Sequence, residues 1–162
     1  MSAVKFREAA PEDVGLILQF IRALADYEKM SDQVVATEEI LREWLFEKNS
    51  ARVIFAMEGE KEVGFALYFY NFSTFLGRAG LYLEDLFVLP EYRGRGYGKG
   101  LLAHLAAMAV ERGCGRMEWV CLDWNQPSID FYRSKNAVSL DDWTIYRLTG
   151  DTLTAFAKED KA

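Results

Sequence analysis

Residues 81–102 read LYLEDLFVLPEYRGRGYGKGLL, and this stretch decides the fold of the chain. The apolar segment Leu81 to Val88 predicts a strand, and the residues after the last glycine predict the start of an amphipathic helix. Between them lies a basic turn, Arg93 to Gly98, that is rich in glycine. Such a turn offers an anion free backbone N–H groups and the positive end of a helix dipole. The stretch therefore predicts a binding site for a phosphate ester.

Two familiar phosphate-binding motifs do not fit this turn. A Walker-type loop would need Gly at Arg93 and Ser or Thr at Gly100. A dinucleotide fingerprint would need Gly at Lys99, or at Leu101 in the other register. What remains is the pattern Arg93-x-x-Gly96-x-Gly98 between a strand and a helix. Alternating glycines after an arginine disfavour the plain alternative, an ordinary glycine-rich connection.

The remaining pattern resembles the acetyl-CoA signature of the GCN5-related N-acetyltransferases, in which the turn amides hold the pyrophosphate. The resemblance implies acetyl-CoA as the co-substrate. If the strand parts from its neighbour, its free backbone groups can also pair with the amides of a pantetheine arm, as an added strand would. The expected cofactor contacts in this stretch are Leu86, Phe87, Val88, Arg93, Gly94, Arg95, Gly96, Tyr97, Gly98 and Lys99.

Length and composition place the chain among single-domain proteins. Its 162 residues, 51% of them apolar, suit one domain over residues 1–162 with a core at about 4–148. The first seven residues do not read as a signal peptide, and no apolar run is long enough to span a bilayer. We therefore expect a cytoplasmic protein.

The charged and metal-binding residue types limit the possible partners. A net charge of −6 disfavours nucleic acid and membrane as partners and suits a cationic substrate. Cys114 and Cys121 match no metal spacing, and His104 is the single histidine. We therefore expect no metal site and two reduced thiols.

Periodicity and turn residues predict an α/β (α+β) fold: a mixed, mostly antiparallel central sheet flanked by helices. The sequence between residues 71 and 80 reads as a loop. The helices are expected at 11–28, 37–45, 98–112, from Asn125 onward, and at 151–158. The strands are expected at Val4–Arg7, Arg52–Met57, Val63–Tyr70, Leu81–Val88, Met117–Leu122 and Asp142–Leu148.

An acyl-CoA ligand calls for a nucleophile as the second substrate, and an alkyl amine has a pKa of about 10. The enzyme must remove that proton and later protonate the leaving thiolate; a carboxylate and a phenol can do this. Glu84 lies on the central strand and is the candidate base. Tyr132, on the short helix from Asn125, is the candidate acid. The plain alternatives are a solvated acid pair at Glu84 and Asp85, and a core aromatic at Tyr132.

Strand alternation separates the two acids of the central strand. It places Glu84 with Leu86 and Val88 on one face, and Asp85 with Phe87 on the other. A bulge near the middle of the strand would change this by re-aiming the second acid. Whether Asp85 faces the substrate therefore stays open at this point.

Several segments resemble the diamine (spermidine/spermine) N-acetyltransferase family, most closely its thialysine-acetylating branch. They are Ala23–Met30, Val63–Phe69, Tyr82–Val88, Tyr92–Gly98 and Trp124–Tyr132. The resemblance implies the acyl-CoA N-acyltransferase (GNAT) fold and direct acetyl transfer to a primary amine, without an acyl-enzyme. It also implies a homodimer with substrate sites close to the subunit interface.

The same resemblance carries roles onto individual residues. Glu84 matches a base that acts through water, Tyr132 matches the acid that protonates the CoA thiolate, and Asn125 matches a position that contacts the cofactor. Glu28 and Asp85, together with Glu84, match acidic positions near the substrate amine. A protein acetyltransferase and a non-catalytic acyl-CoA-binding domain are the alternatives.

One departure from the family pattern concerns substrate length. Polyamine-acetylating members have Asp-Pro-Trp before the central strand, where residues 71–77 here read NFSTFLG. The acid for a distant ammonium is absent from this segment. The sequence therefore favours a small diamine or a lysine-like amino acid, such as thialysine, over a long polyamine.

Overall fold

The structure, a computed structural model, describes residues 3–161. The chain divides into two compact units, residues 1–120 and 121–162. The expectation of a single domain stays a prediction.

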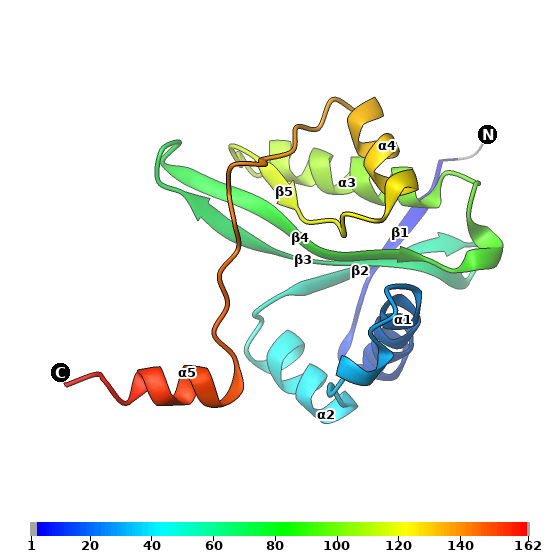
Figure 1. The fold of residues 1–162 in the computed structure, drawn as a ribbon. Coiled ribbons are helices and arrows are strands. Elements are labelled where there is room, and N and C mark those ends of the chain that lie inside the picture. The colour runs from blue at the N-terminus through cyan, green and yellow to red at the C-terminus, as the bar shows by residue number, and fades with distance from the viewer. Residues whose placement is uncertain (1–2, 162) are drawn as a thin grey trace. The chain divides into compact units, whose positions relative to one another are not determined.

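The first unit is built on a five-stranded sheet with the order β1-β2-β3-β4-β5 (Figure 1). The first four strands pair antiparallel, and β5 runs parallel to β4. This confirms the expected mixed, mostly antiparallel sheet. The strands are β1 (Lys5–Glu8), β2 (Arg52–Glu58), β3 (Lys61–Ser73), β4 (Arg78–Val88) and β5 (Met117–Trp119).

Helices cover both faces of this sheet, with α1 and α2 on one side and α3 on the other (Figure 1). Pro11 opens a short 3₁₀ turn before α1, as a proline suits a first helical position. Thr37 caps α2, because its hydroxyl oxygen accepts a hydrogen bond from the Ile40 N–H at 3.2 Å. The helical segments are η1 (Pro11–Asp13), α1 (Val14–Tyr27), η2 (Ser31–Gln33), α2 (Glu38–Leu41), η3 (Arg42–Glu47), η4 (Pro90–Tyr92) and α3 (Tyr97–Glu111).

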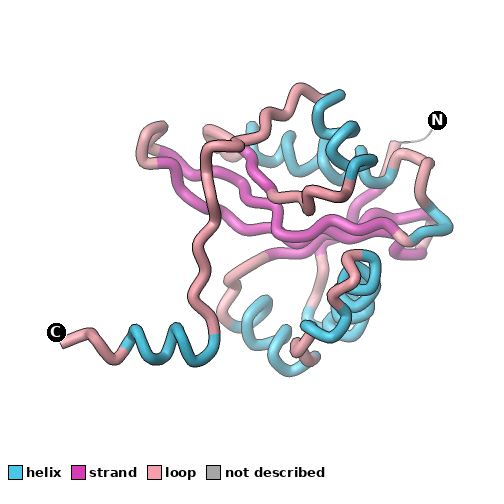
Figure 2. The backbone as a smooth tube through the Cα atoms, in the orientation of Figure 1, coloured by secondary structure: helices cyan, strands magenta, loops and turns pink. Residues whose placement is uncertain are grey.

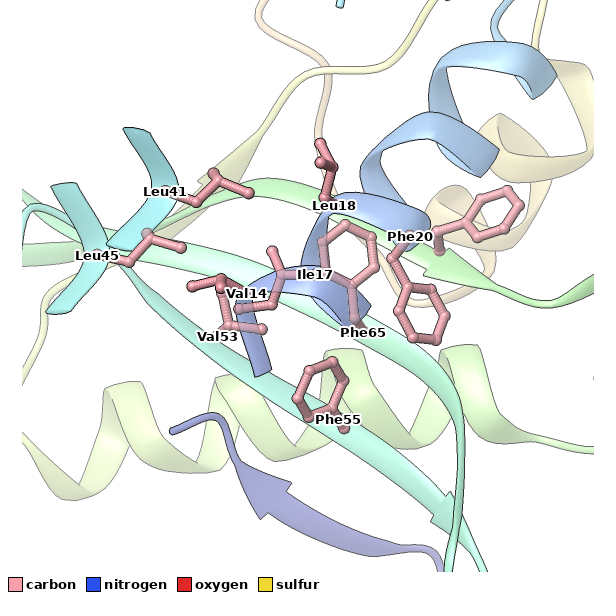
Figure 3. Close-up of a cluster of buried hydrophobic side chains, with 10 residues drawn as sticks. Val14, Ile17, Leu18, Phe20, Leu41, Leu45, Val53, Phe55 and Phe65 are labelled. Carbon is pink, nitrogen blue, oxygen red and sulfur yellow. The ribbon is translucent and has the colours of Figure 1, made fainter. Parts of the chain in front are cut away.

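The main hydrophobic cluster lies between α1, α2 and the sheet. Figure 3 shows the α1 side chains facing phenylalanines of β2 and β3, and the rings of Phe20 and Phe65 stack 5.1 Å apart. Burial of these side chains fixes the position of β3 and β4 relative to α1. The cluster consists of Val14, Ile17, Leu18, Phe20, Leu41, Leu45, Val53, Phe55, Phe65 and Phe87.

Two expected boundaries in this unit are wrong. The loop at 71–80 is only a four-residue turn, since β3 extends to Ser73 and β4 begins at Arg78. Gly77 closes the turn with a φ of 70° and donates its N–H to the Ser73 carbonyl at 2.8 Å. The strand expected at Met117–Leu122 ends at Trp119, where its ladder with β4 stops.

The second unit contains two helices, α4 (Gln126–Ser134) and α5 (Gly150–Ala157). The strand expected at Asp142–Leu148 is wrong, because these residues join no ladder within residues 3–161 and follow a loop course (Figure 2). A strand requires a partner for its backbone N–H and C=O groups, which a favourable composition alone does not supply. Trp143 and Tyr146 are 80% and 90% exposed.

Candidate active site

The glycine turn adopts a conformation that only glycine takes at low cost. Gly94 and Gly96 have φ angles of 76° and 91°, in the left-handed region. Gly96 precedes the first residue of α3, and the first helical hydrogen bond runs from the Gly100 N–H to the Gly96 carbonyl at 2.8 Å. Within residues 3–161, the N–H groups of residues 97–99 have no hydrogen-bond acceptor. The turn thus presents the free N–H groups that a phosphate requires.

Arg93 uses its side chain to hold this turn against the strand. Its Nε donates to the Val88 carbonyl at 3.0 Å. The guanidinium lies over the rings of Tyr27 and Phe87, at 5.0 and 4.9 Å from their centroids. The side chains of Arg93 and Phe87, two of the expected cofactor residues, therefore contact each other within the protein.

The strand that leads into the turn is paired on one side only. The ladder between β4 and β5 stops at Leu83 and Trp119, whereas β3 follows β4 to Val88. From Glu84 onward, β4 therefore has no ladder partner on its β5 side among residues 3–161. An extended ligand with amide groups can pair with such an edge. Leu86 and Val88 lie on this part of the strand, beside the turn.

A β-bulge lies at Glu84, in the middle of β4. Leu67 of β3 is opposite Asp85 while the next residue, Tyr68, is opposite Leu83, so Glu84 is the extra residue. Because opposed residues share a face, Leu83 and Asp85 point to opposite faces despite a spacing of two. Simple alternation around Glu84 is therefore wrong. The structure contains a β-bulge near the middle of the strand, which was the expected exception to simple alternation.

Charge and burial are concentrated around this bulge. The pKa of Asp85 is raised to about 6, first by burial and then by the negative charges of Glu84 and Glu28. Burial also raises the pKa of Glu28, which follows the end of α1. Glu84 itself is exposed. The three acids expected to bind substrate are thus brought together in the first unit, where they form a half-buried anionic site suited to an ammonium group.

Tyr82 is a neighbour of this site that the sequence argument missed. Its pKa is raised by burial and by the charges of Glu84, Glu118 and Asp85. The Tyr82 ring lies 5.1 Å from the Phe69 ring of β3. Because Tyr82 is opposite Phe69 and Asp85 is opposite Leu67, the bulge places Tyr82 and Asp85 on the same face, a position that strand alternation alone does not predict.

Asn125 and Tyr132 belong to the second unit. Asn125 precedes α4 and accepts a hydrogen bond from the Ile129 N–H at 3.1 Å, and Pro127 lies in the first turn of the helix. The Tyr132 ring contacts Phe131 edge-on at 6.0 Å. The helix expected from Asn125 is confirmed. The approach of these two residues to the acids and the glycine turn stays a prediction.

Other features of the described residues lie apart from this site. A cavity of about 110 Å³ is lined by residues of β1, β2 and η3 and by Tyr68 of β3, and by none of the candidate site residues. Residues 3–161 contain no group of three or more His, Cys, Asp or Glu placed to hold a metal ion. Nor does a helix in that range have the length and apolar character to cross a membrane.

Comparison with known proteins identifies the family. The model of the Acetyltransferase (GNAT) family matches residues 18–136, and the chain belongs to this family of N-acetyltransferases, whose co-substrate is acetyl-CoA. The chain is 38% identical to the thialysine N-epsilon-acetyltransferase of Bos taurus, over 97% of this chain and 99% of that protein. It is 32% identical to the L-ornithine N5-acetyltransferase of Arabidopsis thaliana, with 95% and 88% covered.

A solved structure agrees with this assignment. An integron cassette protein from the mobile metagenome of V. cholerae superimposes with a TM-score of 0.80 and 30% identity, over 98% of this chain and 99% of that one. The expected GNAT fold is therefore confirmed.

Proposed function

We propose that this chain transfers acetyl from acetyl-CoA to a primary amine of a small cationic molecule, either a lysine-like amino acid or a short diamine. The observation that carries the proposal is the acidic site at the Glu84 bulge, where Glu84 and Asp85 of the strand that leads into the glycine turn lie near Glu28, at the end of α1. The relatives named for thialysine and ornithine acetylation support the same substrate class.

The turn and the half-paired strand suit two parts of acetyl-CoA, the pyrophosphate and the pantetheine arm. The free N–H groups at the start of α3, with Gly94, Gly96 and Gly98, would hold the pyrophosphate, and the edge at Leu86 and Val88 would pair with the pantetheine amides. Arg95, Tyr97 and Lys99 lie in the same turn and complete the proposed set in this unit. Asn125 and Tyr132 would contact the cofactor from the second unit.

The proposed chemistry is direct attack by the amine on the acetyl carbonyl. Glu84, which is exposed to solvent, accepts the ammonium proton through a water molecule, so that the amine lone pair becomes available. The new C–N bond forms as the C–S bond of the thioester breaks, and the nitrogen releases its second proton to water, which leaves a neutral amide. Tyr132 donates its hydroxyl proton to the departing CoA thiolate, and solvent reprotonates the phenolate.

Substrate length is proposed to be limited by the hairpin between β3 and β4. Asp85 and Glu28 provide negative charge for one ammonium group near the reacting amine. The hairpin turn itself, residues 74–77, reads TFLG and contains no acid, and its Phe75 is fully exposed. A second, distant ammonium would find no carboxylate there, which favours short substrates.

A homodimer in the cytoplasm is the remaining part of the proposal. The large apolar side chains of the second unit support a partner subunit, since nine of those described are about half exposed or more. They are Trp124, Val138, Leu140, Trp143, Ile145, Tyr146, Leu148, Leu153 and Phe156. Light scattering coupled to gel filtration tests this point directly.

The activity is tested by following release of the CoA thiol with thialysine, lysine, ornithine, diamines, spermidine and lysine peptides as acceptors. Turnover on free amino acids and short diamines is expected to exceed turnover on spermidine and on peptides. Higher activity on peptides would establish a protein acetyltransferase instead. Tight acetyl-CoA binding without transfer to any amine would leave a non-catalytic binding domain.

A further inference from the structure

A carboxylate outside the glycine turn contacts that turn from the neighbouring hairpin. Glu58 is the last residue of β2, and its Oε1 accepts a hydrogen bond from the Tyr97 hydroxyl at 2.9 Å. The same oxygen lies 3.3 Å from Nη1 of Arg95. The two partners flank Gly96 in the sequence. A single carboxylate therefore binds the residues on both sides of Gly96, which has a φ of 91°.

Packing does little to hold the turn in place. A Cβ built on Gly94 or on Gly96 would meet no heavy atom within 4 Å. Both glycines have positive φ and can reach many other conformations at low cost. The contacts that restrain the turn are therefore made by side chains: Arg93 binds Val88 at its start, and Arg95 and Tyr97 bind Glu58 further along.

Aromatic contacts reinforce the second of these restraints. The guanidinium of Arg95 lies 5.2 Å from the centroid of the Tyr92 ring. Tyr92 in turn contacts Tyr97 edge-on, with ring centroids 6.5 Å apart. Lys61, from the start of β3, lies over the Tyr92 ring at 5.2 Å. The hairpin between β2 and β3 is therefore connected to the glycine turn by the side chains of Glu58, Lys61, Tyr92, Arg95 and Tyr97.

We propose that Glu58 is a positioning residue for acetyl-CoA: by binding Tyr97 and Arg95, it holds the N–H groups at the start of α3 in the orientation that receives the phosphates. This inference rests on the proposed function, in which the turn binds acetyl-CoA. Preorganised donors bind an anion better than donors that must first be ordered.

The negative charge of Glu58 should have the opposite effect on phosphate binding to its positioning role, so a test can separate the two effects. The negative charge of Glu58 lies next to a site for phosphates, so repulsion alone predicts that removing the charge tightens binding. Positioning predicts the reverse. Tyr97→Phe removes the hydrogen bond without any change in charge, and Glu58→Ala removes both the charge and the acceptor. Glu58→Gln removes the charge but keeps an oxygen acceptor.

The experiment measures calorimetric Kd for CoA and the steady-state KM for acetyl-CoA in these variants. Glu60→Gln is the matched control, because Glu60 lies at the tip of the same hairpin and makes no hydrogen bond or ion pair within residues 3–161. Exposed pairs of this kind have small effects. Glu58→Ala and Tyr97→Phe are expected to raise both constants about three- to fivefold, with kcat and the amine KM little changed in Glu58→Ala. Glu58→Gln should fall between Glu58→Ala and the unmodified protein.

A second readout does not depend on catalysis. ¹⁵N relaxation of Gly94, Gly96 and Gly98 in the free protein reports motion of the turn on the nanosecond timescale. Order parameters should fall in Glu58→Ala and Tyr97→Phe but not in Glu60→Gln. Unchanged order parameters, or tighter CoA binding by Glu58→Ala, would overturn the inference.

The two proposals fail in different ways. If the unmodified protein does not bind CoA, the proposed function falls, and the inference falls with it. If the protein binds CoA and all four variants bind it equally well, the proposed function stands and only the role of Glu58 is lost.

Discussion

The two units of the chain differ in how their residues are held in place. The first unit buries a cluster of large apolar side chains between α1, α2 and the sheet, and it buries further leucines of α3. In the second unit, no described residue between 121 and 161 is buried. The candidate base and acid are divided between them, with Glu84 on a strand of the first unit and Tyr132 on α4 of the second. A buried core therefore fixes the position of the strand that carries the candidate base, whereas the helix that carries the candidate acid has no buried residue among those described in its own unit.

The largest effect that separates the units is expected from large-to-small substitutions. Phe65→Ala, at a fully buried position of β3, should lower the free energy of unfolding by about 3–5 kcal/mol, because it removes buried apolar surface and leaves a cavity. Trp143→Ala, at an exposed position, should change the free energy of the monomer by less than about 0.5 kcal/mol. Urea unfolding at low protein concentration measures both. Equal losses would show that Trp143 is buried within the monomer.

The next effect concerns the base on the first unit. Glu84→Gln should lower kcat by about 10²-fold or more, because the neutral amide no longer accepts the ammonium proton. The Kd for acetyl-CoA should stay within about twofold of its original value, because the proposed cofactor contacts lie in the turn and on the edge of β4. Steady-state rates with thialysine and calorimetry with CoA provide the two numbers. A retained kcat would assign the proton transfer to another group.

The corresponding test on the second unit is Tyr132→Phe. This variant should lower kcat by about tenfold or more, because the leaving thiolate then takes its proton from solvent. Binding of acetyl-CoA should be nearly intact, since the ring is retained. Loss of cofactor affinity in place of turnover would show that Tyr132 has a structural role. A wild-type rate would remove the second unit from the proposed mechanism.

A smaller effect is expected from the pH dependence of stability at Asp85. Its pKa in the folded protein, about 6, lies above the ordinary value of 3.8, because burial and the charges of Glu84 and Glu28 disfavour the carboxylate. The folded state therefore binds more protons than the unfolded state between about pH 4 and 6, and stability contributed by this group is lost as the pH rises through that window. Above it, the charged form costs about 1–2 kcal/mol, which allows for partial solvent screening.

The variant that checks this is Asp85→Asn, with Glu60→Gln as an exposed control on the first unit. Asp85→Asn should raise the free energy of unfolding at pH 7.5 and flatten its decline between pH 4 and 6. The control should leave the pH profile unchanged. An unaltered profile in Asp85→Asn would contradict the raised pKa of Asp85.

Much of the first unit could be predicted because its signals are local. The strand from Leu81 and the helix after Gly98 follow from hydrophobic periodicity, and the turn between them follows from the conformational freedom of glycine. The bulge has no such signal. It arises where β3 and β4 adjust their register between Leu67 and Tyr68, and this adjustment decides that Asp85 lies on the face opposite to that of Leu83.

Contacts between residues far apart in the sequence could not be predicted, for a related reason. Glu58 lies 37 residues before Arg95, and nothing in the local pattern of either residue indicates the contact. The segment Asp142–Leu148 shows the converse error. Its aromatic and β-branched residues favour a strand, but a strand forms only where a second strand can take up its hydrogen bonds.

The amino-acid sequence by itself determined the glycine-rich turn between a strand and a helix, the mixed sheet with its flanking helices, and the choice of Glu84 and Tyr132 as candidate residues. These depend on local patterns of residue type, which the chain carries in any conformation. The tertiary structure alone decided that the three acids meet at a bulge, that Arg93 is enclosed by Tyr27 and Phe87, and that Glu58 restrains the glycine turn. Each of these depends on strand register and on the distance between segments, and the sequence encodes those only through the packing of the whole unit.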